Sequence, residues 1–368
     1  MKGKRYLFLS PLLVLLSIGL LWETQAVSAG VRAGLVACAN VIIPSLFPFM
    51  ILANIIAFSR SGAYLNKSVA GFTKKILGLP EHLGCVVLMS FIGGYPVGAR
   101  MIASKVKNRE ISPQEASRAL CFCVNAGPSY LISAVGAGML SSRSAGLSLY
   151  FSQILSALAI GVIVFRRKRD LCSQRQRGSD ILYGKDVFVS SVTAASAAIL
   201  STCAFVVAFS AIIAFLSAIG ITGLFADILT AILPLQNKDF YIAAFTGIIE
   251  VTSGCAAASG LHTQGGVLLL GFLVSFSSLS IIFQIKSAFA GLSQINFVPF
   301  YLSRLVHGGL TCFLFGISLR FLPPADLMVF SGGQALPAAQ ITPQMMISSV
   351  CLMCMCSILV FTAARKNC

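Results

Sequence analysis

The sequence has 368 residues, of which 57% are hydrophobic and only 10% are charged, and its mean hydropathy is +0.89. Soluble domains carry about 25% charged residues, so this composition excludes a soluble globular protein and indicates a polytopic membrane protein. The net charge of +16 fits an excess of Lys and Arg in cytoplasmic loops. No basic face interleaved with aromatic residues accompanies that charge, so the expected partner is the lipid bilayer and not nucleic acid.

Apolar segments near the ~20 residues that one membrane crossing needs recur along the chain. In chain order they are Tyr6–Leu21, Leu35–Phe58, Cys85–Ala103, Ala119–Leu140, Ala145–Phe165, Val187–Ile219, Phe240–Ser259, Gly266–Ile285, Phe297–Leu322 and Met345–Ala363. A short amphipathic segment, Leu224–Leu233, lies after the sixth of them. The basic start and first apolar run also match a signal peptide cleaved near Val27–Ala29, but a retained first helix suits so polytopic a chain better.

Basic residues between these segments indicate their orientation. With a cytoplasmic N-terminus, most basic clusters face the cytoplasm, provided that Cys85–Ala103 and Phe240–Ser259 each enter and leave the membrane on one side. Both segments are interrupted near their middle, by "GGYP" and by "EVTSG". Irregular backbone at membrane depth is tolerated only within protein or beside a water-filled cavity. We therefore predict about eight full crossings, two re-entrant hairpins, and cytoplasmic N- and C-termini.

The two halves of the chain also resemble each other. "ANIIAF" (Ala53–Phe58) matches "SAIIAF" (Ser210–Phe215), and an interrupted hairpin segment follows each. A helix broken by small polar residues comes next, at "NAGPS" (Asn125–Ser129) and at "SFSS" (Ser275–Ser278). The predicted fold is an all-α polytopic membrane protein with inverted-topology repeats, two opposed re-entrant hairpins and two broken helices. Paired interruptions of this kind point to a transporter's midplane site.

This organisation divides the chain into five parts. They are an N-terminal transmembrane helix (1–27), a first repeat (28–165, hairpin about 83–104), a basic cytoplasmic loop (166–186), a second repeat (187–322, hairpin about 239–260), and a C-terminal loop and transmembrane helix (323–368). The 12 cysteines lack zinc-type spacing and the three histidines form no cluster. Without a phosphate loop or a nucleophile–base set, we expect no metal, no cofactor and no enzymatic activity.

The stretch "SFIGGYPVGARM" (Ser90–Met101) places glycines, a proline and an arginine inside an apolar segment. Pro in the first turn of a helix loses no hydrogen bond, so Pro96 should start the second arm, with Gly93 and Gly94 as the turn. Pro128 should start the second half of its broken helix in the same way. Two helix N-termini would then point inward, each favouring an anion by ~0.3–1 kcal/mol.

Arg100 lies one turn into the second arm of that hairpin. A charge near the bilayer centre costs at least ~2.5–3.5 kcal/mol, so its presence calls for a function. Its planar donor fork suits a carboxylate, which makes a small anion the predicted ligand. Two other interpretations stay open: Arg100 extends to the cytoplasmic surface, or "GGYP" is an ordinary kink at a helix contact.

Glu250 is the one carboxylate deep inside an apolar segment. It would bind a coupling proton or cation, pair with Arg100 or Arg304, or cap the half-helix that follows. Arg304 is itself a weaker candidate. The remaining candidates are small or polar residues at the breaks, for which hydrogen bonding between helices is the alternative role. They are Gly93, Gly94, Tyr95, Asn125, Gly127, Ser129, Thr252, Ser253, Ser275, Ser277, Ser278 and Gln284.

Four segments, in this order, carry a family resemblance: "PSLFPFMILANII", "GGYPVGARM", "NAGPSYLISAVGAGML" and "EVTSGCAAASG". Together they resemble the YlbJ/SpoVV sporulation integral membrane proteins of endospore-forming bacteria, within the group that carries the nucleoside-recognition "Gate" domain. The resemblance covers roughly Val31 to Leu322. One departure is "SFSSLSIIFQ", because the family leads us to expect glycines at Ser277 and Ser278.

The resemblance implies that the protein moves dipicolinic acid (pyridine-2,6-dicarboxylate) across the outer forespore membrane from the mother cell. It also implies similarity to concentrative nucleoside transporters, whose opposed hairpins hold the substrate. Two other functions stay open at this point. One is transport of nucleosides or another neutral metabolite, and the other is a membrane scaffold in the sporulation machinery. The sequence is compatible with a coupling proton or cation and with a homo-oligomer.

Overall fold

The computed structural model describes residues 14, 17–59, 64, 69, 71, 73–77, 83–166, 185–292 and 294–321. Every regular element among them is a helix, which confirms the predicted all-helical class. Most of the predicted first helix, nearly all of the basic loop 166–186, and the whole of 323–368 lie outside the described residues.

The first half begins with one long helical rod. It comprises α2 (Thr24–Ala37), η1 (Cys38–Ile42) and α3 (Ile43–Phe58), so it starts well before the predicted Leu35. The π-helical turn η1 ends two residues before Pro44, whose missing N–H removes one ordinary helical hydrogen bond. Such a widened turn accommodates the proline without ending the rod.

The other elements follow in the order predicted from the interruptions. The first half continues with η2 (Thr73–Leu77), α5 (Gly84–Ile92), α6 (Tyr95–Lys107), α7 (Pro113–Leu120), η4 (Ser129–Met139) and α8 (Arg143–Arg166). The second half contains α9 (Lys185–Ala218), α10 (Ile221–Ile232), α11 (Lys238–Ile249), α12 (Val251–Ser259), α13 (Gln264–Phe276), α14 (Leu279–Ala288) and α15 (Val298–Leu319).

Several of these helices are long and apolar enough to cross a membrane. In the described part of the chain there are five such spans: Thr24–Ile56, Arg143–Phe165, Asp186–Ala218, Gln264–Ala288 and Val298–Leu319. The segment Ala119–Leu140 is divided, as its predicted break at Asn125–Ser129 implies: α7 ends at Leu120 and η4 begins at Ser129. The protein is thus a multi-pass membrane protein in which broken helices accompany continuous ones.

The first interrupted segment folds back on itself. Gly94 has φ +81°, in the region that favours glycine, and separates α5 from α6. A Cβ on Gly98 of α6 would lie only 2.8 Å from the Cβ of Ser90 of α5. Because residues on either side of the turn touch, α5 and α6 form a hairpin and not a kinked helix.

The second interrupted segment has the same construction. Glu250 is in an extended conformation and separates α11 from α12. A Cβ on Gly254 would lie 2.0 Å from the Cα of Gly247, so only glycine fits where the two arms meet. Small residues therefore bring the arms of both hairpins into close contact, as they do between membrane helices generally.

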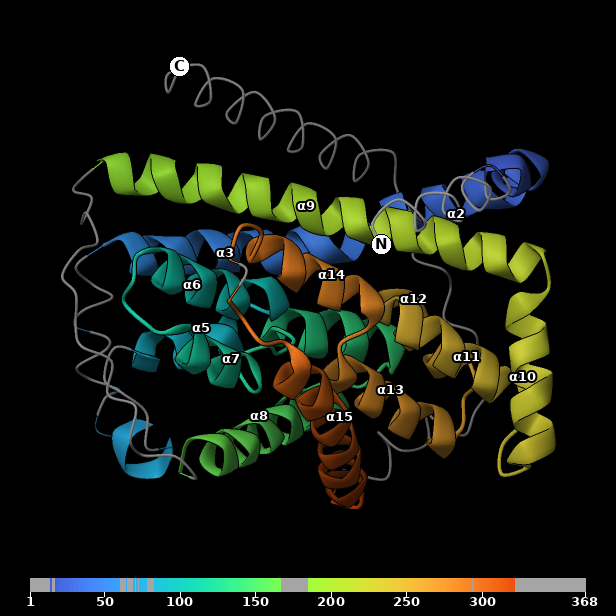
Figure 1. Cartoon of the computed structure of the whole chain (residues 1–368). Coiled ribbons are helices and arrows are strands. Elements are labelled where there is room, and N and C mark those ends of the chain that lie inside the picture. The colour runs from blue at the N-terminus through green and yellow to red at the C-terminus, as the bar shows by residue number, and fades with distance from the viewer. Residues whose placement is uncertain are drawn as a thin grey trace, which may run out of the picture.

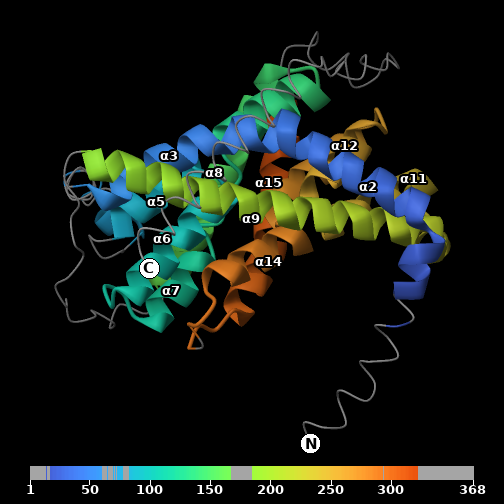
Figure 2. The ribbon, with the colours of Figure 1, turned by 90° about the horizontal axis from the view of Figure 1, so that it is seen from above.

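Two long helical rods form one face of the molecule. Figures 1 and 2 show α9 lying across this face with α2 and α3 beside it. Gly30 and Gly34 give α2 a G-x-x-x-G motif, and both glycines are buried. A Cβ on Gly34 would lie 2.9 Å from the Cα of Val207 in α9. The glycines thus allow the backbones of the two helices to touch.

We expect Gly34→Leu to separate α2 from α9 and to lower the thermal stability of the purified protein. The added side chain has no room, and overpacking of this kind costs about 1–3 kcal/mol or more. Gly309→Leu is the matched control, because a Cβ on Gly309 in α15 meets no atom within 4 Å. A melting temperature for Gly34→Leu equal to that of Gly309→Leu would show that the close contact is not required.

The inverted topology is testable by labelling. In a cysteine-free variant, single cysteines at exposed positions near Ser142 and Thr263 (Ser141 and Gln264) should react from outside. A cysteine at exposed Lys107 should react from the cytoplasm. Reaction of Gln264→Cys with an impermeant reagent only from the cytoplasmic side would contradict the inverted repeat.

Candidate functional site

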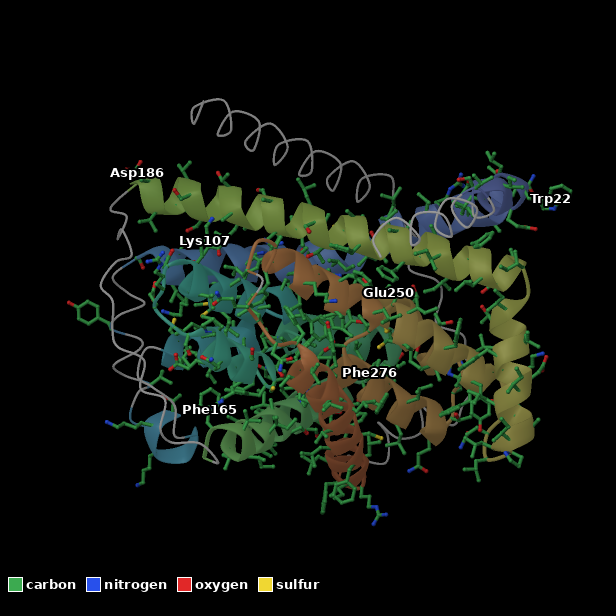
Figure 3. The ribbon with its side chains drawn as sticks, viewed as in Figure 1. Trp22, Lys107, Phe165, Asp186, Glu250 and Phe276 are labelled. Carbon is green, nitrogen blue, oxygen red and sulfur yellow. The ribbon has the colours of Figure 1, made fainter. Side chains whose placement is uncertain are left out.

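A cavity lies between the tips of the two hairpins. It contains about 410 Å³ of space not filled by atoms, a figure that includes its open mouth. Its walls come from η1, α3, α9 and α14, from both hairpin tips, and from the break before η4. The lining residues are Ile42, Ser45, Leu46, Tyr95, Pro96, Gly127, Tyr130, Thr202, Val206, Glu250, Val251, Thr252, Ile281 and Gln284. Figure 3 shows Glu250 near the middle of the fold, beneath α9.

The N-terminus of α6 reaches the cavity next to that of η4. Pro96 lies in the first turn of α6 and Pro128 directly precedes η4, as the prolines predict. A Cβ on Gly127 would lie 3.3 Å from the amide nitrogen of Gly94, so the two ends touch. Neither helix has an acidic residue in its first turn. Two positive dipole ends therefore meet at one side of the cavity.

Tyr95 connects the two halves of the protein at the cavity. Its hydroxyl donates a hydrogen bond to the carbonyl oxygen of Val274, in the last turn of α13. The side chain is buried and lines the cavity. The tip of the first hairpin is thereby attached to the broken helix of the second half.

Glu250 caps the second hairpin arm. Its Oε1 accepts a hydrogen bond from the Thr252 N–H at 3.0 Å, and its Oε2 accepts one from the Ser253 N–H at 2.7 Å. The side chain is fully buried. Of the roles open to Glu250, the structure therefore shows the cap of α12. Neither Arg100 nor Arg304 pairs with it among the described ion pairs.

Two buried polar groups in the lining have unused hydrogen-bonding capacity. In the described part of the chain, neither the Tyr130 hydroxyl nor the Gln284 Oε1 atom has a hydrogen-bond partner. The Gln284 amide nitrogen donates to the Ser280 hydroxyl at 3.2 Å, which orients the free oxygen. Buried polar groups normally have partners, so these two groups suit contact with a bound molecule or water.

The predicted site residues divide into two groups. Tyr95, Gly127, Glu250, Thr252 and Gln284 line the cavity. The others lie outside its lining: Gly93, Gly94, Arg100, Asn125, Ser129, Ser253, Ser275, Ser277 and Ser278.

Arg100 lies along α6 about 6 Å beyond Pro96, from four residues at 1.5 Å each. It is half-buried, and among the described residues no acidic side chain pairs with it. Asn125 donates to the Phe122 carbonyl at 2.7 Å and to the Ser90 hydroxyl at 3.4 Å. These bonds give Asn125 a structural role, because they tie the first broken helix to α5.

The break in the second broken helix contains three serines. The hydroxyls of Ser275, Ser277 and Ser278 are buried, and none has a hydrogen-bond partner in the described structure. Ser277 has φ +61°, a left-handed conformation that is uncommon outside glycine. The family pattern leads to the same expectation, glycine, at this position.

A buried arginine holds the break in the first broken helix. Arg304 of α15 donates through Nη1 to the Val124 carbonyl at 2.7 Å and through Nη2 to the Cys121 carbonyl. Its side chain is only 1% exposed and its guanidinium lies over the Phe300 ring. The carbonyls that follow α7 are thus satisfied by a full positive charge, which also complements the negative end of that helix.

His307 and Gln153 extend this network. Nδ1 of His307 lies 3.2 Å from Nη1 of Arg304, and its Nε2 lies 3.2 Å from the Gln153 carbonyl. Because arginine only donates, Nδ1 accepts and Nε2 carries the proton. The Gln153 side chain in turn makes two bonds with the backbone of Ala126, at 3.1 and 3.2 Å. We call Arg304, His307 and Gln153 the break-holding network.

Sequence reasoning missed His307 and Gln153 as members of this network. It also missed Tyr130 and the wall residues of α3 and α9. A usable signal existed for two of them, since His307 lies one turn from Arg304 and Gln153 is a lone amide within an apolar helix.

The fold and the cavity define an all-helical integral membrane protein with several apolar spans, in which two hairpins and two broken helices surround a cavity. The particular relationship is a distant one. The chain is 23% identical over 326 residues to the sporulation integral membrane protein YlbJ of Bacillus subtilis (strain 168), a match that covers 82% of this chain and 80% of YlbJ. This homology confirms the resemblance indicated by the four sequence segments. No model of a known protein family matches the sequence.

Two solved structures of the concentrative nucleoside transporter CNTnw are similar to the fold. A double mutant in an outward-facing state gives a TM-score of 0.48 at 13% identity, over 91% of this chain and 88% of CNTnw. An inward-facing, substrate-bound state gives 0.42 at 12% identity, over 84% and 83% of the two chains.

Proposed function

We propose that the protein is a membrane transporter of a small organic anion that binds in the cavity between the hairpin tips. The first candidate is dipicolinic acid, moved across the outer forespore membrane during sporulation. The observation that carries the proposal is the meeting of two uncapped helix N-termini, those of α6 and η4, at one cavity between the hairpin tips. The proposed role is transport and not catalysis.

Electrostatics support an anion despite Glu250. Each helix N-terminus is equivalent to roughly +0.5 elementary charge, and three of them, those of α6, η4 and α12, reach the cavity. The Glu250 carboxylate faces the third, where both of its oxygens accept backbone N–H groups. Arg100 adds a full positive charge one turn along α6, with no acidic partner among the described residues. A bound carboxylate would supply that partner.

The distant homology supports the biological setting. YlbJ is named a sporulation integral membrane protein, and the present chain aligns with four-fifths of it. A rigid pyridine dicarboxylate could offer one carboxylate to the adjacent ends of α6 and η4. Contact of the other with Arg100 would require the substrate to extend beyond the lining of the cavity, because Arg100 lies outside it. A proton or cation is a reasonable coupling partner for such a transporter.

A neutral metabolite such as a nucleoside is the second candidate. No Lys or Arg is among the residues that line the cavity, whereas free hydrogen-bonding groups are, at Tyr130 and Gln284. Such groups form hydrogen bonds with the hydroxyl and amide groups of a ligand and do not require the ligand to be charged.

Uptake by the purified protein in liposomes distinguishes these candidates. Labelled dipicolinate should accumulate with an imposed ion or proton gradient and should be displaced by unlabelled dipicolinate but not by nucleosides. Uptake of a labelled nucleoside with no competition from dipicolinate would favour the second candidate. A third outcome would favour a membrane scaffold. In that case the protein moves neither solute, and cells that carry substitutions of Tyr95 and Gln284 still sporulate normally.

Arg100 provides a specific prediction for the anion. Arg100→Lys should lower the apparent affinity for dipicolinate about ten- to a hundredfold, since an ammonium cannot make two parallel bonds to a carboxylate. Arg100→Gln should be weaker still. With picolinate, which has one carboxylate fewer, wild type and variants should differ little.

Lys107→Gln is the matched control, because it removes an exposed charge at the far end of the same helix. Equal dipicolinate uptake by wild type and Arg100→Gln would show that Arg100 only extends toward the membrane surface.

A further inference from the structure

The contact between α2 and α9 places two cysteines opposite each other. The two helices run antiparallel along this contact, so residue numbers increase in α2 as they decrease in α9. Gly30 faces Ala214, and Gly34 faces Val207. Continuing this antiparallel register by one turn brings Cys38 to Cys203. The Sγ atom of Cys38 is indeed 3.7 Å from the carbonyl oxygen of Cys203.

The two thiols form a buried pair. Cys38 is 2% and Cys203 is 4% exposed, and the Cys38 thiol donates a hydrogen bond to the backbone carbonyl of Cys203. Both are reduced in this structure. A disulfide needs Cα atoms about 4.4–6.8 Å apart. One turn away, a Cβ on Gly34 would lie 2.9 Å from the Cα of Val207, so the two backbones approach closely beside the cysteines.

We propose that Cys38 and Cys203 are a redox modification site that closes into a disulfide on contact with a small apolar disulfide. In the first exchange, one thiolate attacks the reagent, an S–S bond of the reagent breaks, and one reagent thiol leaves. In the second, the other cysteine attacks the mixed disulfide, the Cys38–Cys203 bond forms, and a second reagent thiol leaves. Two protein thiols are oxidised and one disulfide molecule is reduced to two thiols.

A disulfide between Cys38 and Cys203 would lie beside one wall of the cavity. Ile42 lies one turn after Cys38, while Thr202 and Val206 flank Cys203, and all three line the cavity. The bond would join residues 165 positions apart and hold this wall of the cavity at a fixed width. It would also constrain the unfolded chain, which is the usual basis of stabilisation by a disulfide. Formation of the bond does not depend on the proposed transport function.

The test uses the full chain with only Cys38 and Cys203 retained. Treatment of the detergent-purified protein with 2,2′-dipyridyl disulfide should release two pyridine-2-thione molecules per chain. Mass spectrometry should then find a cross-link between the peptides that contain Cys38 and Cys203. The melting temperature should rise by about 3 °C or more, and dithiothreitol should reverse the rise.

A variant that retains only Cys121 and Cys255 is the matched control, because both thiols are buried, Cys121 directly after α7 and Cys255 in α12, and no hydrogen bond joins them among the described residues. It should keep pyridyl groups as mixed disulfides. Mixed disulfides at Cys38 and Cys203, no reaction there at all, or equal cross-linking in the control would overturn the proposal. None of these readouts requires uptake of a solute, so a failed transport assay leaves the result interpretable.

Discussion

Arg304→Leu should be among the most damaging single substitutions in the protein. It leaves the buried carbonyls of Cys121 and Val124 without donors, and each such group costs about 1–3 kcal/mol. Arg304→Lys should be intermediate, since a compact ammonium can reach one carbonyl but cannot span both. The measurement is thermal unfolding in detergent, followed by solute uptake for any variant that remains folded.

Substitution of Arg304 should also affect the cavity and therefore solute uptake. The break held by Arg304 contains Gly127, which lines the cavity and contacts Gly94 of the first hairpin. Uptake by Arg304→Lys should therefore fall more than its stability alone would explain. Arg320→Leu is the control, because Arg320 lies at the exposed end of the same helix. A stable, active Arg304→Leu protein would show that the break keeps its shape without the break-holding network.

Local chemistry explains which parts of the fold could be predicted from the sequence. Glycine and proline act on their own backbone, so "GGYP" was enough to predict a turn at Gly94 and a helix start at Pro96. The same applies to the break before Ser129. Composition alone gave the membrane class, because too few charged residues are present to cover a soluble surface.

Contacts between distant segments could not be read in this way. Arg304 binds carbonyls about 180 residues away, and Tyr95 bonds to Val274 in the other half. Neither partner is a side chain, so no pattern of residue types marks the pair. The walls from α3 and α9 were missed for a related reason, since their apolar lining resembles any buried helix face.

Glu250 illustrates how local sequence leaves a role undecided. A lone carboxylate in an apolar segment suggests proton or cation coupling, yet an acidic residue just before a helix is also a standard cap. The sequence contains both signals at one position. Only the folded backbone decides between them, by directing the Thr252 and Ser253 N–H groups at the two carboxylate oxygens.

Glu250→Gln should accordingly lower stability without changing how uptake depends on pH. A glutamine can present one oxygen to one N–H, but its NH₂ group faces the other N–H, and a hydrogen bond to a charged group worth about 1.5–3 kcal/mol is lost. Glu250→Asp keeps the charge on a shorter side chain and should retain more stability. The measurements are thermal unfolding and uptake of dipicolinate across a range of pH.

Asn237→Ala is the matched control, because Asn237 caps the other arm of the same hairpin, at its exposed outer end. It should cost about 0.5–2 kcal/mol and leave the cavity unchanged. If Glu250→Gln is as stable as wild type while its uptake no longer varies with pH, the carboxylate carries the coupling proton. Loss of stability with an unchanged pH profile would show that Glu250 acts as a helix cap. Its charge then stabilises the N-terminus of α12, and the N-termini of α6 and η4 stay free for a carboxylate of the substrate.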